Sequence, residues 1–274
     1  RPLAGRAAVF SLLPFSCEES PGVSIFRGGF PEIVTKQAEA DTWFRSYVQT
    51  YLERDVRSIS SIRDLTTFRR FLTLTAGRVG QVLNKTGLAA PLGISVPAVT
   101  EWLNILEATH QIILVPPFYE NLGKRLVKSP KIYFSDSGLA AHLLGIESEK
   151  AMMRSPFLGP LFEGFVAEEI VKAQLNRGRR KELYHFRDRP GLEVDFLVPT
   201  SDRSITLIEA KASRTIRPGD TLSMLRLRKN MAQYRTSSYL VHLPSPALVG
   251  IHAAGKDAKA VSFTGISKAL YPKS

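Results

Sequence analysis

Residues 191–211 have the sequence GLEVDFLVPTSDRSITLIEAK, in which two β-rich runs flank the turn-rich residues PTSDRS. This pattern predicts a β-hairpin. If the hairpin is symmetric about Asp202, residues whose numbers sum to 404 face each other. Asp195 then lies opposite Glu209, with Cβ atoms about 5 Å apart. Because strand side chains alternate, Glu209 and Lys211 share a face, roughly 6.6 Å apart. The hairpin therefore predicts two carboxylates and a lysine on one face of a sheet.

A third carboxylate is expected from a helix over residues 160–171, which precedes the hairpin. Glu163 borders the apolar stripe of this helix and is expected to lean toward the sheet, whereas Glu168 is expected to point to solvent. The apolar stripe consists of Phe162, Phe165, Val166, Ile170 and Ala173.

Side-by-side carboxylates repel one another, and a divalent cation relieves that repulsion. Glu163, Asp195 and Glu209 would offer the hard oxygen ligands that Mg²⁺ or Mn²⁺ prefers. Lys211 would orient a water or neutralise charge on a phosphoryl group. These four residues are the candidate catalytic set, and the three acids are the candidate metal ligands. A salt-bridged cluster on a surface hairpin is the alternative that the same pattern allows.

The middle of the chain predicts a winged helix. Phe68 to Leu74 begin one helix, and Val79, Val82 and Leu83 suggest another. Ser95 is placed to cap a further helix that ends near His110. Two short apolar strands follow, Ile112–Val115 and Lys131–Phe134, joined by a basic loop. Helices followed by a two-stranded ribbon are typical of the winged-helix plan, in which one helix enters the major groove and the ribbon meets the backbone.

The cations of this module favour the ribbon over the helix as the DNA contact. The exposed side of the recognition-helix candidate offers Thr100, Glu101, Asn104 and Glu107, without Arg or Lys, which argues against strong base readout. A protein-packing role for the module stays open. The candidate DNA-binding residues are Lys124, Arg125, Lys128 and Lys131 in and beside the ribbon loop, and Arg187 further on.

Composition favours a polyanionic partner. Lys and Arg number 37 against 25 Asp and Glu among 274 residues, so the net charge is +12. Phosphate neutralisation supplies most non-specific nucleic-acid affinity, so DNA, duplex or branched, is the expected partner, although an inert basic surface would look the same. The single Cys17 fits a reducing compartment. No run approaches the ~20 apolar residues of a membrane span, so we expect a cytoplasmic chain without a membrane partner.

The ordered set of motifs resembles known proteins. A helix Glu, then Asp on one strand and Glu-x-Lys on the next is similar to the PD-(D/E)xK restriction-endonuclease-like superfamily, which includes Holliday junction resolvases. More closely, nearly the whole chain resembles the C-terminal part of archaeal and bacterial AAA-type ATPases that end in a conserved domain of unknown function. The segments that carry this resemblance are residues 3–6, 28–32, 51–55, 129–139, 161–166 and 193–211.

The resemblance implies an ATPase domain upstream, a winged helix and a nuclease-like terminal domain. The expected fold class is α/β, or α+β overall. Because the chain begins at Arg1 rather than Met and lacks a Gly-x-x-x-x-Gly-Lys-[Ser/Thr] segment, we expect a piece without ATPase activity, and ATP bound only by the upstream domain. The expected divisions are 1–18 as the end of the ATPase domain, 19–62 as a helical connector, 63–136 as the winged helix and 137–274 as the restriction-endonuclease-like domain.

Two functions follow from this sequence. One is a DNA-binding, Mg²⁺-dependent DNA-processing nuclease. The other is a non-catalytic DNA- or protein-docking module that regulates or tethers the ATPase. Fold alone does not establish activity, so the sequence leaves cleavage open. It is also compatible with a homo-oligomer.

Overall fold

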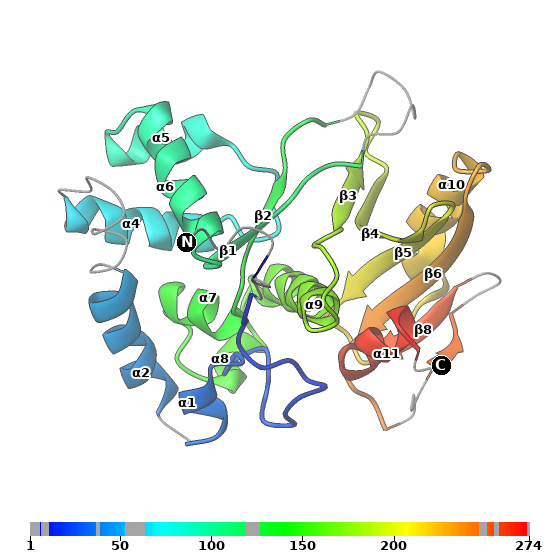
Figure 1. The fold of residues 1–274 in the computed structure, drawn as a ribbon, viewed down its shortest axis with the longest axis horizontal. Coiled ribbons are helices and arrows are strands. Elements are labelled where there is room, and N and C mark those ends of the chain that lie inside the picture. Colours follow the sequence, from blue (N-terminus) through cyan, green and yellow to red (C-terminus); the bar gives the residue numbers. More distant parts are fainter. Residues whose placement is uncertain are drawn as a thin grey trace.

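The computed structural model describes residues 6, 11–36, 39–52, 64–118, 127–246, 251–254 and 258–272. It has the predicted mixed α/β class, with helices and two sheets (Figure 1). Half of the predicted end of an upstream domain, residues 1–18, lies outside the described part, namely residues 1–5 and 7–10. No helix in the described ranges is both long and apolar enough for a membrane crossing.

The first helices are α1 (Pro31–Val34) and α2 (Ala40–Tyr47), which continues into a π-helical turn, η1 (Val48–Leu52). The sequence predicts one helix with Asp41 as N-cap, running to about Val56, and the cap assignment is wrong. Glu39 is the cap, because its carboxylate accepts hydrogen bonds from the backbone N–H groups of Asp41 and Thr42. The Asp41 carboxylate instead pairs with His142 and, one turn along, with Arg45. Residues 53–56 lie outside the described part.

Helices α4 (Leu65–Ala76), α5 (Lys85–Leu92) and α6 (Val96–Ala108) form the next unit. Ser95 caps α6, as predicted, by accepting a 3.2 Å hydrogen bond from the Ala98 N–H. The helix suggested by Val79, Val82 and Leu83 is wrong. That segment turns and bonds to the neighbouring strand instead, through Gly80 N to Ile132 O and Leu83 N to Pro130 O. The helix starts at Lys85, after the Asn84 cap.

Strands β1 (Ile112–Val115) and β2 (Lys131–Phe134) form the predicted antiparallel ribbon. All four residues of β2 are buried, so the base of the ribbon lies inside the molecule between the helical part and the sheet (Figure 1). Beyond β1 the chain continues along the edge of the large sheet, where His185 N donates to Pro116 O and Phe118 N donates to His185 O. The ribbon therefore covers a sheet edge that would otherwise present unpaired backbone groups.

Two segments that carry the resemblance, residues 28–32 and 129–139, meet at the buried Asp136, the residue before α7 (Ser137–Leu143). Its carboxylate accepts hydrogen bonds from Gly29 N at 2.7 Å and Leu139 N at 2.9 Å. Gly28 adopts φ +70°, and a Cβ there would lie 2.1 Å from Asp136 Oδ1, so only glycine fits. These contacts thus hold the N-terminal segment against α7.

The C-terminal half is a six-stranded sheet in the order β3-β4-β5-β6-β8-β7. The pairs β3–β4, β4–β5 and β7–β8 are antiparallel, and β5–β6 and β6–β8 are parallel. The strands are β3 (Tyr184–Arg187), β4 (Glu193–Ser201), β5 (Ser204–Lys211), β6 (Arg235–His242), β7 (Ile251–Ala253) and β8 (Lys259–Ser262). The other elements of this half are α8 (Glu149–Met152), α9 (Leu158–Leu175), η2 (Pro218–Thr221), α10 (Leu222–Lys229), η3 (Phe263–Gly265) and α11 (Ile266–Leu270).

Helices cover both faces of this sheet. On one face, Phe196, Val198 and Ile208 belong to a large hydrophobic core that also includes α9, the ribbon and helices α4 to α6. On the other face, α10 contributes Met224 and Leu227 to a smaller core. The helical part and the sheet therefore share one core, and α9 lies at its centre (Figure 1).

Candidate functional site

The hairpin has the predicted register. Phe196 pairs with Ile208, and the pairs that follow, through Pro199 with Ile205, keep the predicted sum. A bulge beside the turn shifts Ser201 opposite Ser204, so the strands extend further toward Asp202 than predicted. The hydrophobic alternation fixes this register, because a slip of one residue would turn every buried side chain outward.

Asp195 and Glu209 lie just beyond the last paired residues, Phe196 and Ile208. Asp195 Oδ2 accepts a 2.9 Å hydrogen bond from Ala210 N, so a side chain takes the place of a ladder bond. The Asp195 and Glu209 carboxyl groups are also hydrogen-bonded to each other. The predicted neighbours therefore meet where the two strands separate.

Glu163 reaches the same place from α9. Its Oε1 accepts hydrogen bonds from Lys131 Nζ, at 2.8 Å, and from the Tyr133 hydroxyl. Both donors lie on β2, where alternation puts them on one face of the strand. The Glu163 side chain is 17% exposed and that of Asp195 is 14% exposed, so solvent reaches the acids.

Lys131 lies at the centre of the cluster. Its Nζ is 2.8 Å from Glu163 Oε1, 2.6 Å from Glu193 Oε1 and 3.7 Å from Asp195 Oδ1, with 2% of the side chain exposed. Burial acts to lower the pKa of Lys131, but the three carboxylates outweigh it and raise the pKa above its usual value. Lys131, a predicted DNA contact, therefore has its ammonium directed at three acids rather than at solvent.

The acids of the cluster are strongly perturbed. Burial raises the pKa of Glu209 to about 10, with repulsion from Asp195 and the hydrogen bond to it adding to the effect and Lys211 opposing it. Burial also raises the pKa of Glu163 to about 7, with Asp195 adding and Lys131 opposing. Burial next to Asp195 therefore favours the protonated form of the Glu209 carboxyl group.

The three predicted ligands converge but do not fit a divalent cation in this arrangement. The Lys131 ammonium already lies within 4 Å of Glu163 and Asp195, so a dication among them would meet a like charge at close range. In the described part of the chain, no three His, Cys, Asp or Glu side chains are grouped so that they could hold a metal ion. The cluster has its own cation.

Two members of the cluster, Tyr133 and Glu193, are not among the predicted site residues. Strand alternation could identify both, because Tyr133 shares a face with Lys131 and Glu193 shares one with Asp195. The winged-helix prediction instead places the Lys131–Phe134 strand in a ribbon that meets DNA.

The remaining predicted DNA-binding residues are Lys124, Arg125, Lys128 and Arg187. Lys124 and Arg125 lie outside the described residues. Lys128 is exposed, and Val127 N donates to Arg187 O at 3.1 Å, which brings Lys128 near Arg187. The Arg187 side chain is 45% exposed and lies 3.4 Å from Glu193 Oε2.

Glu168 does not point to solvent, so that prediction is wrong. It is 1% exposed and accepts a 3.3 Å hydrogen bond from Lys172 Nζ, one turn along α9. Glu169, also buried, lies 3.9 Å from the same ammonium. Helix α9 is buried on all sides of its middle, so the helical period could not show which acid faces water.

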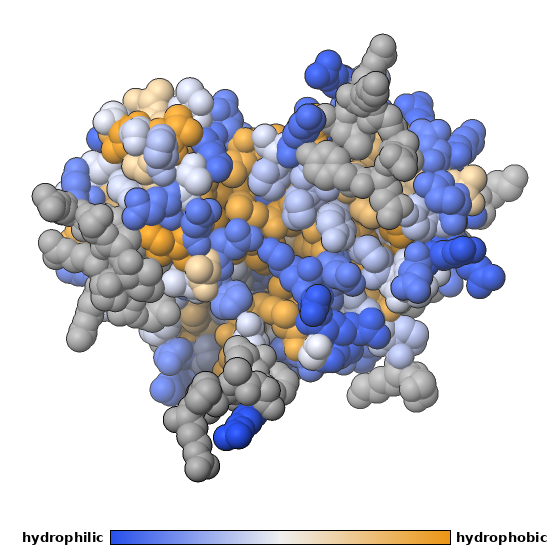
Figure 2. Space-filling view, turned by 45° about the horizontal axis from the view of Figure 1, so that its top comes forward, coloured by the Kyte–Doolittle hydropathy of each residue, from blue (hydrophilic) through white to orange (hydrophobic). Residues whose placement is uncertain are grey.

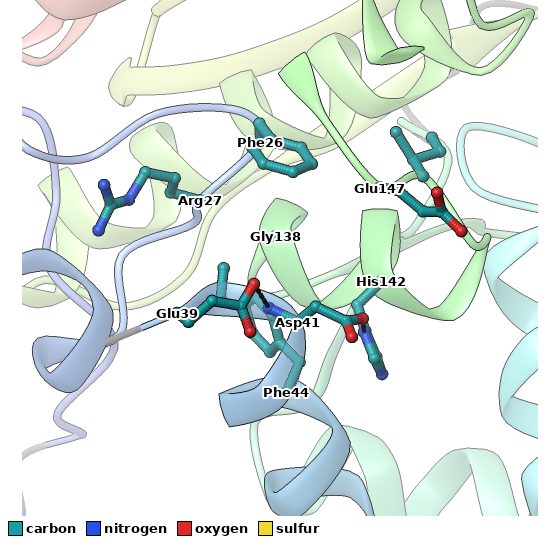
Figure 3. A pocket seen from close by; sticks show the side chains of 10 residues that line it. Phe26, Arg27, Glu39, Asp41, Phe44, Gly138, His142 and Glu147 are labelled. Atoms are coloured by element: carbon teal, nitrogen blue, oxygen red, sulfur yellow. Dashed lines mark hydrogen bonds and ion pairs between the residues drawn. The ribbon is translucent and has the colours of Figure 1, made fainter. Parts of the chain in front are cut away.

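A pocket of about 330 Å³ lies elsewhere, between α2, α7 and the Phe26–Arg27 segment (Figure 3). Some of its polar groups have partners, whereas the buried Arg27 Nε has no hydrogen-bond partner among the described residues. Glu39 caps α2, and Asp41 Oδ1 lies 2.9 Å from His142 Nδ1. The pocket contains none of the predicted site residues.

Comparison with known proteins divides the chain near the start of α9. Residues 23–150 match the family model of a domain of unknown function, DUF8612, and residues 158–250 match that of another, DUF4143. Uncharacterised proteins of Mycobacterium tuberculosis and Mycobacterium bovis are each 34% identical to the chain over 179 residues, which is 65% of this chain and 40% of theirs. The chain thus spans about 40% of the length of these relatives. No solved structure matches.

Proposed function

We propose that this chain is the C-terminal, DNA-associated region of an AAA-type ATPase, and that it binds DNA without cutting it. The observation that carries the proposal is the position of Lys131, which supplies the carboxylate cluster with an internal cation. The match of residues 158–250 to DUF4143 fits the terminal domain of unknown function that the resemblance to these ATPases includes. The greater length of the relatives leaves room for a motor domain.

The charge distribution supports DNA as the partner. The net charge is +12, and exposed Lys128 and Arg187 belong to neighbouring segments, joined by the Val127 N to Arg187 O hydrogen bond where the ribbon reaches β3. In the space-filling view, hydrophilic side chains predominate over the sheet, whereas hydrophobic ones gather over α5 and α6 (Figure 2). We therefore place the DNA contact at the ribbon and β3, through phosphates rather than base edges.

Binding should be tested by fluorescence anisotropy with duplex and branched DNA across a range of salt concentrations. Joint replacement Lys128→Ala and Arg187→Ala should weaken binding to every sequence and lower the log–log salt slope by about 2. The matched control replaces Lys150 and Lys259, two exposed lysines on α8 and β8, by Ala. It should leave the salt slope close to that of the wild type. An equal loss of DNA affinity in both double variants would show that the ribbon is not the DNA-binding site, and would favour protein docking.

A second candidate is a nuclease that uses Mg²⁺ or Mn²⁺, favoured by the convergence of Glu163, Asp195 and Glu209 beside Lys211. It requires Lys131 to leave the cluster. Incubation of the chain with nicked, branched and single-stranded DNA and either metal separates the candidates. If the chain binds DNA without cutting it, the DNA should stay intact. Cleavage that disappears in Asp195→Asn would establish the nuclease instead.

A further inference from the structure

The ion pairs of Lys131 join two parts of the chain. Lys131 lies on β2, within the segment that matches DUF8612, whereas Glu163, Glu193 and Asp195 lie on α9 and β4, within the DUF4143 segment. Each carboxylate within 4 Å of its ammonium therefore belongs to the other matched segment.

The ribbon is tied to the sheet a second time, near its far end. His185 on β3 exchanges backbone hydrogen bonds with Pro116 and Phe118, and His185 Nε2 lies 3.2 Å from Ser129 O. Backbone pairing of this kind is neutral and resists salt and ions, whereas the Lys131 cluster is ionic and partly open to solvent, with Glu193 31% exposed. Unlike the backbone pairing, the ionic attachment at Lys131 should respond to the cations around it.

We infer that Lys131 is the resident cation of the carboxylate cluster: it latches the ribbon to the sheet domain and keeps divalent cations out. This inference rests on the proposed binding function, since it gives the reason why the cluster does not take a metal. A buried ammonium that leaves would expose uncompensated carboxylates, and those carboxylates would then attract a divalent cation. The Lys131 ion pairs and a divalent cation in the cluster are therefore mutually exclusive.

Two measurements on the purified chain test the latch. Hydrogen exchange of the β1, β2 and β3 amides reports ribbon attachment, and calorimetric titration with MnCl₂ reports cation access. In Lys131→Met, ribbon amides should exchange about a hundredfold faster, because one partner of a buried ion cluster has been removed. Mn²⁺ should bind this variant about a hundredfold more tightly than the wild type, because a like charge at close range is gone.

A second variant distinguishes loss of the latch from a failure to fold. The pair Lys131→Met with Glu193→Gln removes one charge of each sign and keeps Glu163, Asp195 and Glu209 available as oxygen ligands. It should fold and still bind Mn²⁺, and further replacement Asp195→Asn should abolish that binding. Lys150→Met, on the exposed surface of α8, should match the wild type in both measurements.

The outcomes separate this inference from the proposed function. Wild-type ribbon exchange and no Mn²⁺ binding in the charge-balanced pair would overturn the latch. Equal Mn²⁺ affinity in wild type and variants would do so too, because the lysine would then exclude nothing. If the wild type cuts DNA and Lys131→Met cuts it faster, the binding-only function fails while the latch stands.

Discussion

Helix α9 takes part in two lysine–carboxylate clusters that differ in origin and exposure. Near its start, Glu163 joins Lys131 from β2 and Glu193 and Asp195 from β4. About two turns further along, Lys172 pairs with Glu168 and Glu169 of the same helix, and these side chains are only 1–2% exposed. The first cluster is assembled from distant segments and reaches solvent, whereas the second is local and sealed.

The partners of the second cluster explain its role. Lys172 Nζ donates to Phe15 O at 3.1 Å, and Glu169 Oε2 accepts from Cys17 N at 3.0 Å. Burial raises the pKa of both Glu168 and Glu169, with Lys172 opposing. These contacts fix the N-terminal segment against α9. A buried charge cluster is therefore a candidate binding site only where solvent and a second element reach it.

The largest effect should come from Lys172→Met. It leaves two sealed carboxylates without their cation, and the free energy of unfolding should fall by about 4 kcal/mol, as measured by urea denaturation. The variant should gain no affinity for Mn²⁺, since the site is closed. Lys229→Met, at the exposed end of α10, is the matched control and should stay within about 0.5 kcal/mol of wild type. Mn²⁺ binding by Lys172→Met would erase the distinction between the clusters.

A smaller effect should follow from Glu209→Gln, through pH. Because the folded pKa of Glu209 is raised to about 10, its stabilising contribution is complete below the unfolded pKa and declines as pH rises toward 10. Wild type should therefore lose on the order of 2 kcal/mol more stability than Glu209→Gln between pH 5 and pH 8. The stability of Glu209→Gln should still decline as pH rises, up to about pH 7, because the folded pKa of Glu163 is raised to about 7.

Thermal or urea unfolding at several pH values measures this difference. Glu101→Gln, on the exposed face of α6, is the control and should run parallel to wild type. Parallel curves for wild type and Glu209→Gln would mean that burial does not raise the pKa of Glu209 in the folded chain.

The smallest effect should come from Tyr133→Phe, which removes one of the two donors to Glu163 and keeps the ring. We expect a loss of about 1 kcal/mol, because the remaining donor, Lys131, still satisfies the same oxygen. Tyr239→Phe is the control, since its hydroxyl makes only a 3.5 Å contact with Ala269 O. If both changes cost the same, Tyr133 contributes nothing to the open cluster beyond packing.

Local patterns carried much of the prediction. The alternation in residues 193–211 predicts the hairpin, its register and the meeting of Asp195 with Glu209, because both strands and their turn lie within one short segment. Ser95 is found as a cap for the same reason, since a cap bonds to an N–H three residues away. Where competing partners are distant, local rules fail: Asp41 pairs with His142 and leaves the cap to Glu39.

By itself the sequence determined the class of the fold, the hairpin and the acids that meet at its open end. Only the tertiary structure decided what those acids bind. Lys131 lies 32 positions before Glu163 and 64 before Asp195, and no periodicity relates such residues. The same holds for Glu168, whose burial depends on the segments that close over α9 rather than on the helix period. A charged side chain goes where burial leaves it a partner, and that partner is fixed only when distant segments pack together.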